Sequence, residues 1–124
     1  MGSSFYISAD REKVGPWTFT GDQVTDSVRR HWPDATVSNA FEGFLEIVAD
    51  VDPGRPAELS FNLRHGVFGF EDRGSPVGPL TVIYTVLNDL APQVPVAWWV
   101  DYDVDLQPLD LAGGLDAFIA SFPA

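Results

Sequence analysis

The feature that most limits what this chain can fold into is an alternation of apolar and polar side chains along its middle third. In Phe44–Val51 and again in Ala57–Arg64, apolar residues recur at every second position. Successive side chains of a β-strand point to opposite faces, so each segment predicts a strand with one buried face. His65-Gly66 fits a tight two-residue turn in which glycine supplies the positive φ. The predicted antiparallel meander has four strands, Thr36–Phe41, Phe44–Val51, Ala57–Arg64 and Val67–Glu71.

A helix is predicted immediately before this meander, over Gly21–His31. Thr20 is its N-cap and Gln23 is the partner at the third helical position, which together make a capping box. Proline disfavours helical geometry in the residue before it, so Pro33 ends the helix. One apolar stripe recurs every four residues, at Val24, Val28 and Trp32.

Other segments are less simple to interpret. Pro79–Leu90 is rich in β-branched residues, which favours a strand, but its apolar residues recur at helical spacing and it is long for a strand, so we predict a helix. Phe5–Ala9 predicts a short strand, and Val14–Phe19 predicts either a second short strand or an ordered loop. A last helix is predicted with Asp110 as its N-cap. Its apolar stripe is Leu111, Leu115, Phe118, Ile119 and Phe122.

The segment Val96–Asp105 reads as one strand with two contrasting faces. Alternation places Val96, Trp98, Val100, Tyr102 and Val104 on an apolar face. The opposite face then carries Ala97, Trp99, Asp101, Asp103 and Asp105. One strand would therefore supply an apolar anchor on one side and a row of three carboxylates beside an aromatic ring on the other.

Together these elements predict an α+β fold in a single domain that spans residues 1–124. We expect an antiparallel β-sheet, a meander of about five to six strands, with two to three helices packed on it. No internal repeat, low-complexity segment or long linker divides the chain.

Acidic residues outnumber basic ones by 18 to 7, which gives a net charge of −11. Nucleic acid is a poor direct partner for such a chain, because phosphate binding needs clustered Lys and Arg. A strongly negative surface steers a protein toward a basic partner, whereas the alternative is a solvated acidic surface with no partner. Cysteine is absent, which excludes disulfides, thiol catalysis and cysteine-based zinc sites.

Membrane insertion is not expected. The longest apolar stretches, Leu80–Leu87 and Val94–Val100, are far shorter than the roughly 20 residues of a spanning helix. The first residues lack the basic region and apolar run of a secretory signal. The expected location is therefore the cytoplasm.

The row Asp101, Asp103 and Asp105 is the most suggestive candidate site. An EF-hand loop would need Gly and Glu at the positions that Leu106 and Ala112 occupy, so that calcium site is excluded. Three alternatives remain: a hard cation held by other oxygen ligands, carboxylates that bind Arg or Lys of a protein partner, and a charged strand edge that resists aggregation. Trp99 is an anchor for the partner, a platform on which a sugar stacks, or a ring covered by a helix.

Signatures of catalysis are missing from the sequence. No nucleophile elbow, phosphate-binding glycine loop or paired metal-binding histidines are found, and His31 and His65 are the only histidines. Asp101 facing Glu46 or Glu58 would resemble the paired carboxylates of a glycosidase, but no pattern selects such a pair. We therefore assign no catalytic residue, no metal ligand and no cofactor.

As a whole the chain resembles the small, acidic, single-domain immunity proteins of bacterial toxin systems. The resemblance rests on size, charge, the lack of cysteine, the order of elements and the segments ELSFNLRHGVFGFED and VAWWVDYDVD. It implies a non-enzymatic inhibitor that blocks a toxin, and basic toxins complement acidic inhibitors electrostatically. No diagnostic motif can be placed, so no functional residue carries over.

The sequence leads to three hypotheses about function. The first is an immunity-type inhibitor that grips a basic partner through Asp101, Asp103, Asp105 and Trp99. The second is a small enzyme or ligand-binding domain that uses carboxylates in a pocket between sheet and helices. The third is an accessory domain that forms a homodimer through exposed aromatic residues.

Overall fold

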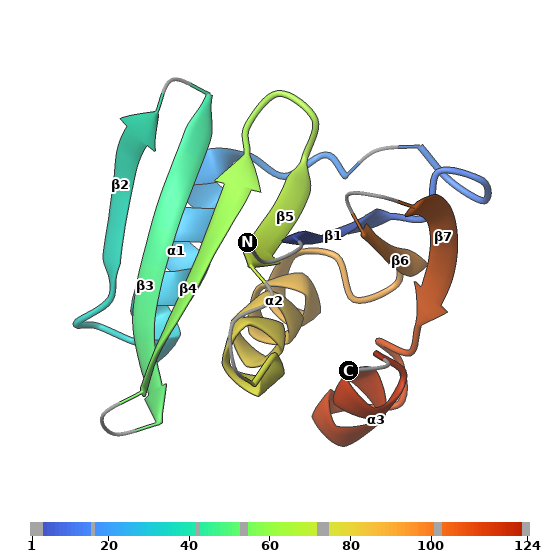
Figure 1. The fold of residues 1–124 in the computed structure, drawn as a ribbon. Coiled ribbons are helices and arrows are strands. Elements are labelled where there is room, and N and C mark those ends of the chain that lie inside the picture. Colours follow the sequence, from blue (N-terminus) through green and yellow to red (C-terminus); the bar gives the residue numbers. More distant parts are fainter. Residues whose placement is uncertain are drawn as a thin grey trace.

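The computed structural model describes residues 4–15, 17–41, 43–52, 55–71, 75–100 and 103–122, with the side chains of residues 40, 41, 52, 55, 103 and 104 left out. Figure 1 shows how the elements are arranged. The strands are β1 (Ser4–Ala9), β2 (Thr36–Phe41), β3 (Phe44–Asp52), β4 (Arg55–Asn62), β5 (Val67–Glu71), β6 (Val96–Val100) and β7 (Asp103–Leu109). The helices are α1 (Gly21–His31), α2 (Val77–Leu90) and α3 (Leu115–Ala120).

The described strands form one antiparallel sheet in the order β2-β3-β4-β5-β1-β6-β7. The α+β prediction is confirmed, and so is the meander, which becomes β2 to β5. The N-terminal strand β1 lies between β5 and β6, so it joins the meander to the C-terminal hairpin. Seven strands are described where five to six were expected, because the segment after Val96 forms two strands rather than one.

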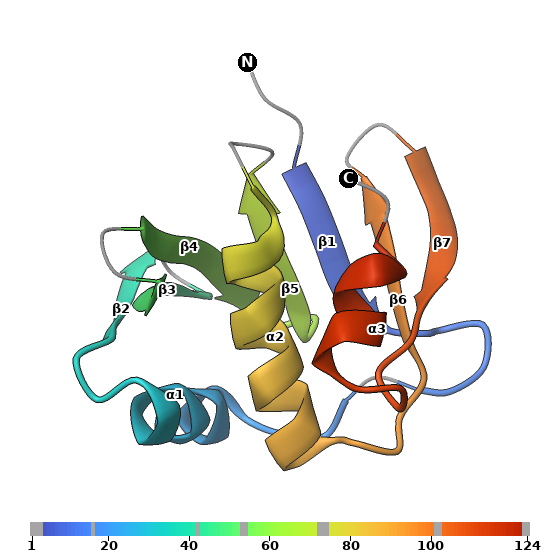
Figure 2. The same ribbon diagram turned by 90° about the horizontal axis from the view of Figure 1, so that it is seen from below.

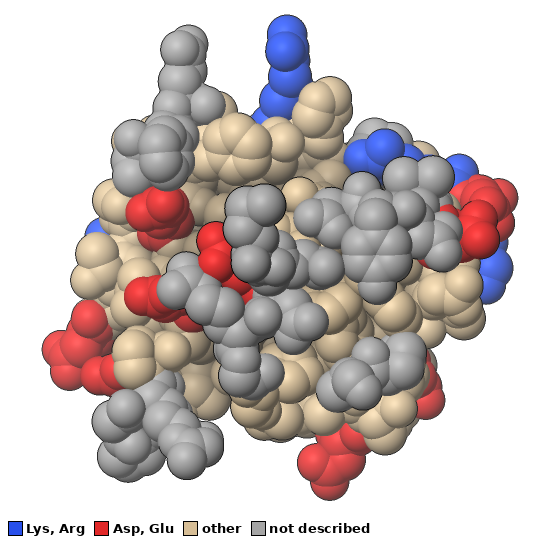
Figure 3. All heavy atoms as spheres, in the orientation of Figure 1, with Lys and Arg blue, Asp and Glu red and all other residues tan. Residues whose placement is uncertain are grey.

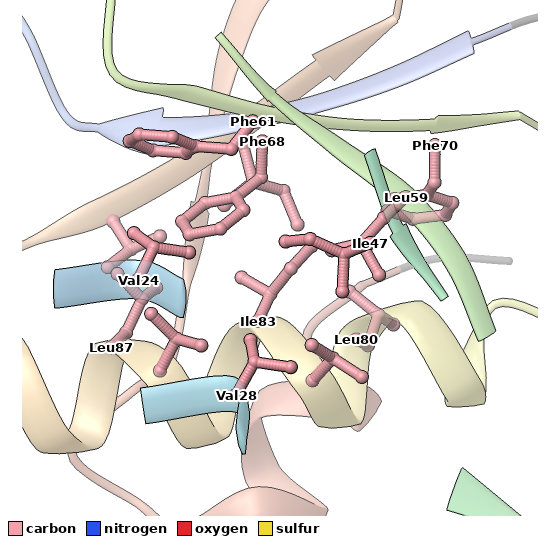
Figure 4. Packing of buried hydrophobic residues seen from close by; sticks show 14 of the residues in the cluster. Val24, Val28, Ile47, Leu59, Phe61, Phe68, Phe70, Leu80, Ile83 and Leu87 are labelled. Carbon is pink, nitrogen blue, oxygen red and sulfur yellow. The ribbon is translucent and has the colours of Figure 1, made fainter. Parts of the chain in front are cut away.

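The helices cover one face of the sheet, as Figure 2 shows, and leave the other face without a helix. Figure 4 shows side chains of α1, α2 and the strands meeting between the two layers. Phe61, Phe68 and Ile83 are at most 2% exposed there, and Phe118 brings α3 into the same core. Burial of each such side chain stabilises the fold by about 1.5–3 kcal/mol, so this layer holds the helices on the sheet.

Helix α1 has the predicted bounds and the predicted cap. The Gln23 amide N–H donates to Thr20 Oγ1 at 3.2 Å, and the Thr20 amide N–H donates to Gln23 Oε1 at 2.8 Å. Val24 and Val28 are fully buried, and Trp32 ends the helix by donating its N–H to the Val28 carbonyl. The capping box and the stripe therefore fix where α1 begins and which face it buries.

The segment Pro79–Leu90, whose sequence was compatible with a strand or a helix, is a helix as predicted. Helix α2 begins two residues earlier than predicted, at Val77. Its hydroxyls are satisfied within the helix, because Thr81 and Thr85 donate to the carbonyls four residues earlier at 2.7 and 2.8 Å. The helix lies between α1 and α3 (Figure 2), which explains its apolar residues on more than one side. Its buried residues are Leu80, Val82, Ile83, Val86 and Leu87.

The structure decides one alternative that the sequence left open and corrects one expectation. Val14–Phe19 contains no strand in its described part, and it is an ordered loop in which Trp17 is 9% exposed. Asp110 is not the N-cap of α3, because that helix begins only at Leu115, after Gly114 with φ +100°. Instead the Asp110 carboxylate accepts the Gly113 N–H at 2.9 Å, which stabilises the turn before the helix.

No helix in the described part of the chain is both long enough and apolar enough to cross a membrane.

Candidate functional site

The open face of the sheet is built from every second residue of its strands. Residues that are paired directly across neighbouring strands point to the same face of a sheet. Following these pairs from strand to strand gives one continuous row with one residue from each strand that it crosses. Six strands contribute to it, and we call it the central row. Its members are Ser38, Glu46, Ser60, Gly69, Tyr6 and Trp99.

At one end of the central row two aromatic rings stack. The Tyr6 and Trp99 ring centroids are 5.7 Å apart at an interplanar angle of 29°, and both residues are partly exposed. The Arg11 guanidinium lies 5.9 Å from the Trp99 ring. Trp98 points to the other face, where its ring lies 4.9 Å from that of Phe122. Trp99 is therefore on the face that the helices do not cover.

The predicted strand Val96–Asp105 is wrong as a single element. It ends at Val100, and β7 begins at Asp103 as the edge strand of the sheet. β7 pairs back on β6, with Leu109 opposite Val96 and both buried, so folding back buries apolar surface that one long strand would leave at an edge. Pro108 has no backbone N–H to donate. It is tolerated in β7 because this strand lies at the edge of the described sheet.

This hairpin separates the predicted site residues. Trp99 lies on β6, Asp103 begins β7, and Asp105 lies on β7 with an exposed side chain. Asp101 lies outside the described residues, as does the side chain of Asp103. Because β6 and β7 are separate strands, the four residues do not share the face of one strand as predicted. Their role as partner contacts remains a prediction.

A concave surface of about 600 Å³ opens on the face away from the helices, where β4 and β5 separate. The described pairing of these strands runs only from Asn62↔Val67 to Ser60↔Gly69. Beyond that pair β4 continues along β3, whereas β5 continues along β1, and Figure 1 shows the two strands diverging. We call this concavity the β4–β5 groove.

Helix α2 supports the β4–β5 groove from behind. A Cβ atom on Gly78 would lie 3.2 Å from the Ala57 Cβ, so the start of α2 packs closely on β4. Ser75 and Pro79 also line the groove. Since the helix occupies the side facing the core, the groove opens toward the uncovered face.

The walls of the groove combine carboxylates with apolar surface. Glu46 and Glu58 line the β3 and β4 side, and Glu71 lines the β5 side, all with exposed side chains. Tyr6 of β1 lies beyond β5, and its ring packs over Gly69: a Cβ there would lie 3.3 Å from both the ring and Ser60 Oγ. Glycine at this position therefore gives the ring its place in the groove.

Charged side chains at the described strand positions of the open face are acidic, whereas the Arg11 guanidinium reaches the Trp99 end of this face from the turn after β1. The strand positions of this face carry Glu46, Asp50, Glu58 and Glu71, and no Lys or Arg occupies such a position among the described side chains. Figure 3 shows acidic side chains over β3 and β4, while the most prominent basic ones stand at the upper and right-hand margins. This arrangement gives the face a negative potential that attracts cationic groups.

A second titratable cluster joins α1 to α2. Asp89 Oδ2 accepts the Ser27 hydroxyl at 2.6 Å, lies 3.0 Å from His31 Nε2, and is 3.9 Å from the Arg30 guanidinium. Burial by itself would raise the pKa of Asp89, but the hydrogen bonds from Ser27 and His31 and the charges of His31 and Arg30 lower it below the ordinary value of 3.8.

This cluster does not have the geometry of a nucleophilic site. Ser27 is fully buried, and its hydroxyl donates to the carboxylate rather than to the histidine. A nucleophilic serine needs its base within hydrogen-bond reach and access to substrate. We conclude that the Ser27, His31 and Asp89 contacts hold two helices together.

The space between the sheet and the helices is filled by the core, so the carboxylate-bearing pocket expected there lies instead on the opposite face. A smaller concavity of about 410 Å³ beside Trp17 has mainly apolar walls and no acidic residue. Among the described residues no group of three or more His, Asp or Glu is placed to hold a metal ion.

Comparison with protein-family models, with curated proteins and with solved structures finds no match to this chain.

Proposed function

We propose that the protein is a non-enzymatic binding module, an immunity-type inhibitor that neutralises a basic toxin or another basic partner in the cytoplasm. The observation that carries the proposal is the uncovered sheet face, where Glu46, Asp50 and Glu58 are exposed and no Lys or Arg occupies a strand position among the described side chains. Charged groups of one sign on an open surface favour a partner of opposite charge.

The charge of the whole chain supports the same conclusion. A net charge of −11 on 124 residues destabilises the compact state through self-repulsion. The same field accelerates association with a basic protein, because it steers the encounter before contact. A basic partner would relieve the repulsion on binding.

The proposed contact surface extends along the central row to Trp99. A partly exposed aromatic residue with one ring face already stacked on Tyr6 is a rigid anchor of the kind found at interface hot spots. Asp101, Asp103 and Asp105 are proposed to add carboxylates at the adjacent edge, where β7 ends the sheet. The partner would then span the sheet from β3 to β7.

The β4–β5 groove favours a second candidate, a small-ligand-binding domain or enzyme. Glu46 is paired with Ser60, so it is diagonal to Glu58, and such diagonal neighbours lie roughly 7–8 Å apart. Two carboxylates on neighbouring strand positions in a concavity are the kind of pair that acid–base chemistry uses. Both are exposed, however, and a general acid needs a carboxyl group shielded from water, so binding is the better-supported function.

Comparative affinity capture tests the proposed function. The immobilised full chain is compared with a sheet-face variant, Glu46→Gln, Glu58→Gln and Glu71→Gln, and with a helix-face variant, Asp22→Asn, Asp26→Asn and Asp116→Asn. Both variants lose three negative charges at exposed positions. We expect a basic protein that the wild type and the helix-face variant retain and the sheet-face variant loses.

Co-expression then tests inhibition. The captured protein should impair growth when produced alone, and the wild-type chain should restore growth where the sheet-face variant does not. Equal capture by the two variants would contradict the proposed surface. A captured protein without any toxicity would contradict the immunity function while leaving the binding function in place.

A further inference from the structure

The described sheet ends in two edge strands that differ in how they are protected against further pairing. β7 contains Pro108 and the charged residues Asp103 and Asp105. Proline and charge both hinder the pairing of an edge with another strand. β2, at the opposite edge (Figure 1), contains neither proline nor a charged residue. A register shift follows Ser38, so residues 36–38 are the regularly paired part of this edge.

The pairing registers show which backbone groups of β2 face outward. In an antiparallel ladder the N–H and C=O of one residue point to the same neighbouring strand, and the direction alternates along the chain. The Leu63 N–H donates to the Gly43 carbonyl at 2.9 Å, so odd-numbered residues of β3 bond to β4 and even-numbered ones bond to β2. Ser38, paired with Glu46, therefore bonds to β3. Val37 directs its N–H and C=O to the edge, where the described sheet has no further strand.

The side chains at this edge suit an added strand with one basic and one apolar face. Thr36 and Ser38 are small and exposed on the open face, and Glu46 of β3 lies directly beyond Ser38. Neighbouring strands are about 4.8 Å apart, so a residue opposite Ser38 would lie about 9.6 Å from Glu46, backbone to backbone, which a long cationic side chain spans. Val37 points to the helix-covered face and is half-buried, so an apolar residue opposite it would cover the rest of its side chain.

We propose that β2 is the docking edge for an extended strand of the basic partner, in which arginine or lysine alternates with apolar residues. The strand forms two backbone hydrogen bonds with Val37, a cationic side chain crosses Ser38 to reach Glu46, and an apolar side chain packs beside Val37. Strand addition of this kind gains affinity from the main chain and specificity from alternate side chains. The inference rests on the proposed function and specifies how the partner presents its positive charge.

A second copy of this chain fits the edge less well. β2 has no basic residue to place opposite Ser38. Two chains that each carry a net charge of −11 also repel each other. The charge of the adjacent sheet face therefore selects a basic strand as the occupant.

The probe for this edge is the peptide acetyl-Gly-Arg-Val-Arg-Val-Arg-Gly-amide, titrated into the full chain and followed by amide chemical shifts and hydrogen exchange. In the free protein the Val37 amide should exchange faster than the Ser38 amide, because only Ser38 bonds to β3. Saturating peptide should slow exchange at Val37 about tenfold and shift the resonances of β2 and β3. The permuted peptide acetyl-Gly-Arg-Arg-Arg-Val-Val-Gly-amide has the same composition and charge without the alternation, and it should bind about threefold more weakly or worse.

Variants separate backbone pairing from charge. Val37→Pro removes the outward N–H, a change that an edge strand tolerates, and should abolish binding. The peptide with both valines N-methylated should lose binding to the wild-type chain in the same way, and this arm does not depend on the folding of a variant. Glu46→Gln should raise the Kd about three- to tenfold, as loss of one charge-assisted contact implies. The matched control Asp116→Asn, exposed on α3, should change the Kd by less than about twofold.

Equal affinity for the alternating and permuted peptides, an unprotected Val37 amide at saturation, equal effects of Glu46→Gln and Asp116→Asn, or no binding at millimolar peptide would overturn the docking edge. Protection of Val37 that grows with protein concentration in the absence of peptide would assign the edge to a second copy and overturn it as well.

The sheet-face and helix-face capture experiment is independent of this titration. A basic protein that the wild type and Val37→Pro retain equally, and that the sheet-face variant loses, would leave the acidic face as a binding surface and remove only the added strand.

Discussion

Glu58 of β4 and Glu71 of β5 lie on opposite walls of one groove, two residues beyond the last pair that joins their strands. An uninterrupted ladder would place their side chains face to face. The sheet opens at this point, and it does so on the face that no helix covers (Figure 1). Two acidic residues at positions that continue the register thus coincide with a concavity of about 600 Å³ in the described surface.

Neutralising one wall should stabilise the fold. Glu58→Gln removes the repulsion between Glu58 and its diagonal neighbour Glu46, so we expect the free energy of unfolding to rise by about 0.2–1 kcal/mol. Urea unfolding at low ionic strength measures it. Asp26→Asn removes the same charge from a helix surface, and an equal gain in that variant would show that net charge rather than the groove is responsible.

Salt should stabilise the protein as a whole. Since the net charge is −11, screening weakens self-repulsion more than it weakens the few described ion pairs. The urea midpoint should therefore rise between low and physiological ionic strength, where the Debye length falls to about 8 Å. A midpoint that falls with added sodium chloride would show that attractive pairs dominate.

The cap of α1 provides a stability test that is independent of charge. Thr20→Ala removes the acceptor of the Gln23 amide N–H and should cost about 1 kcal/mol, whereas Thr20→Ser keeps the hydroxyl and should cost far less. Thermal unfolding of the three proteins measures the difference. Equal losses in both variants would assign the effect to the threonine methyl group instead.

Asp89 predicts a pH dependence of stability. Its pKa is lower in the folded protein than in the unfolded chain, so its carboxylate stabilises the fold fully above about pH 4. That contribution is lost as pH falls through the lowered pKa. Asp89→Asn should therefore cost about 1–2 kcal/mol at neutral pH, because it removes the negative charge that strengthens the contacts with Ser27 and His31.

Unfolding curves of wild type and Asp89→Asn across pH 2 to 7 check this dependence. The difference between them should be constant near neutrality and shrink toward acid. Ser27→Ala is the companion variant, because it removes the buried donor and keeps the charge. A difference between wild type and Asp89→Asn that grows below pH 4 would contradict the direction of the pKa shift.

Local signals in the sequence were sufficient for much of the fold. The capping box at Thr20 and the alternation in β3 and β4 act between residues near in sequence. Helix α1 has the predicted bounds, and both strands formed, although β4 begins and ends two residues earlier than predicted. Helix α2 was decided by the spacing of its apolar residues, which proved stronger than the strand preference of its β-branched residues. The pairing of β1 with β5 and β6 had no local signal, because it joins distant segments.

The candidate site was harder to predict for the same reason. Alternation continues through Val96–Asp105 in the sequence, and only pairing between Val96 and Leu109 reveals that the chain turns back. The β4–β5 groove depends on which residues the register sets opposite each other, as Glu58 and Glu71 show. Given the correct strand order, two acids at paired positions would have been the signal for it.

The most direct test of the account is the association rate of the captured basic protein with the wild-type, sheet-face and helix-face chains at several salt concentrations. The account predicts that neutralising Glu46, Glu58 and Glu71 slows association about tenfold at low salt and flattens its dependence on salt, while the helix-face variant stays close to wild type. Identical rates and salt dependences for the two variants would contradict it.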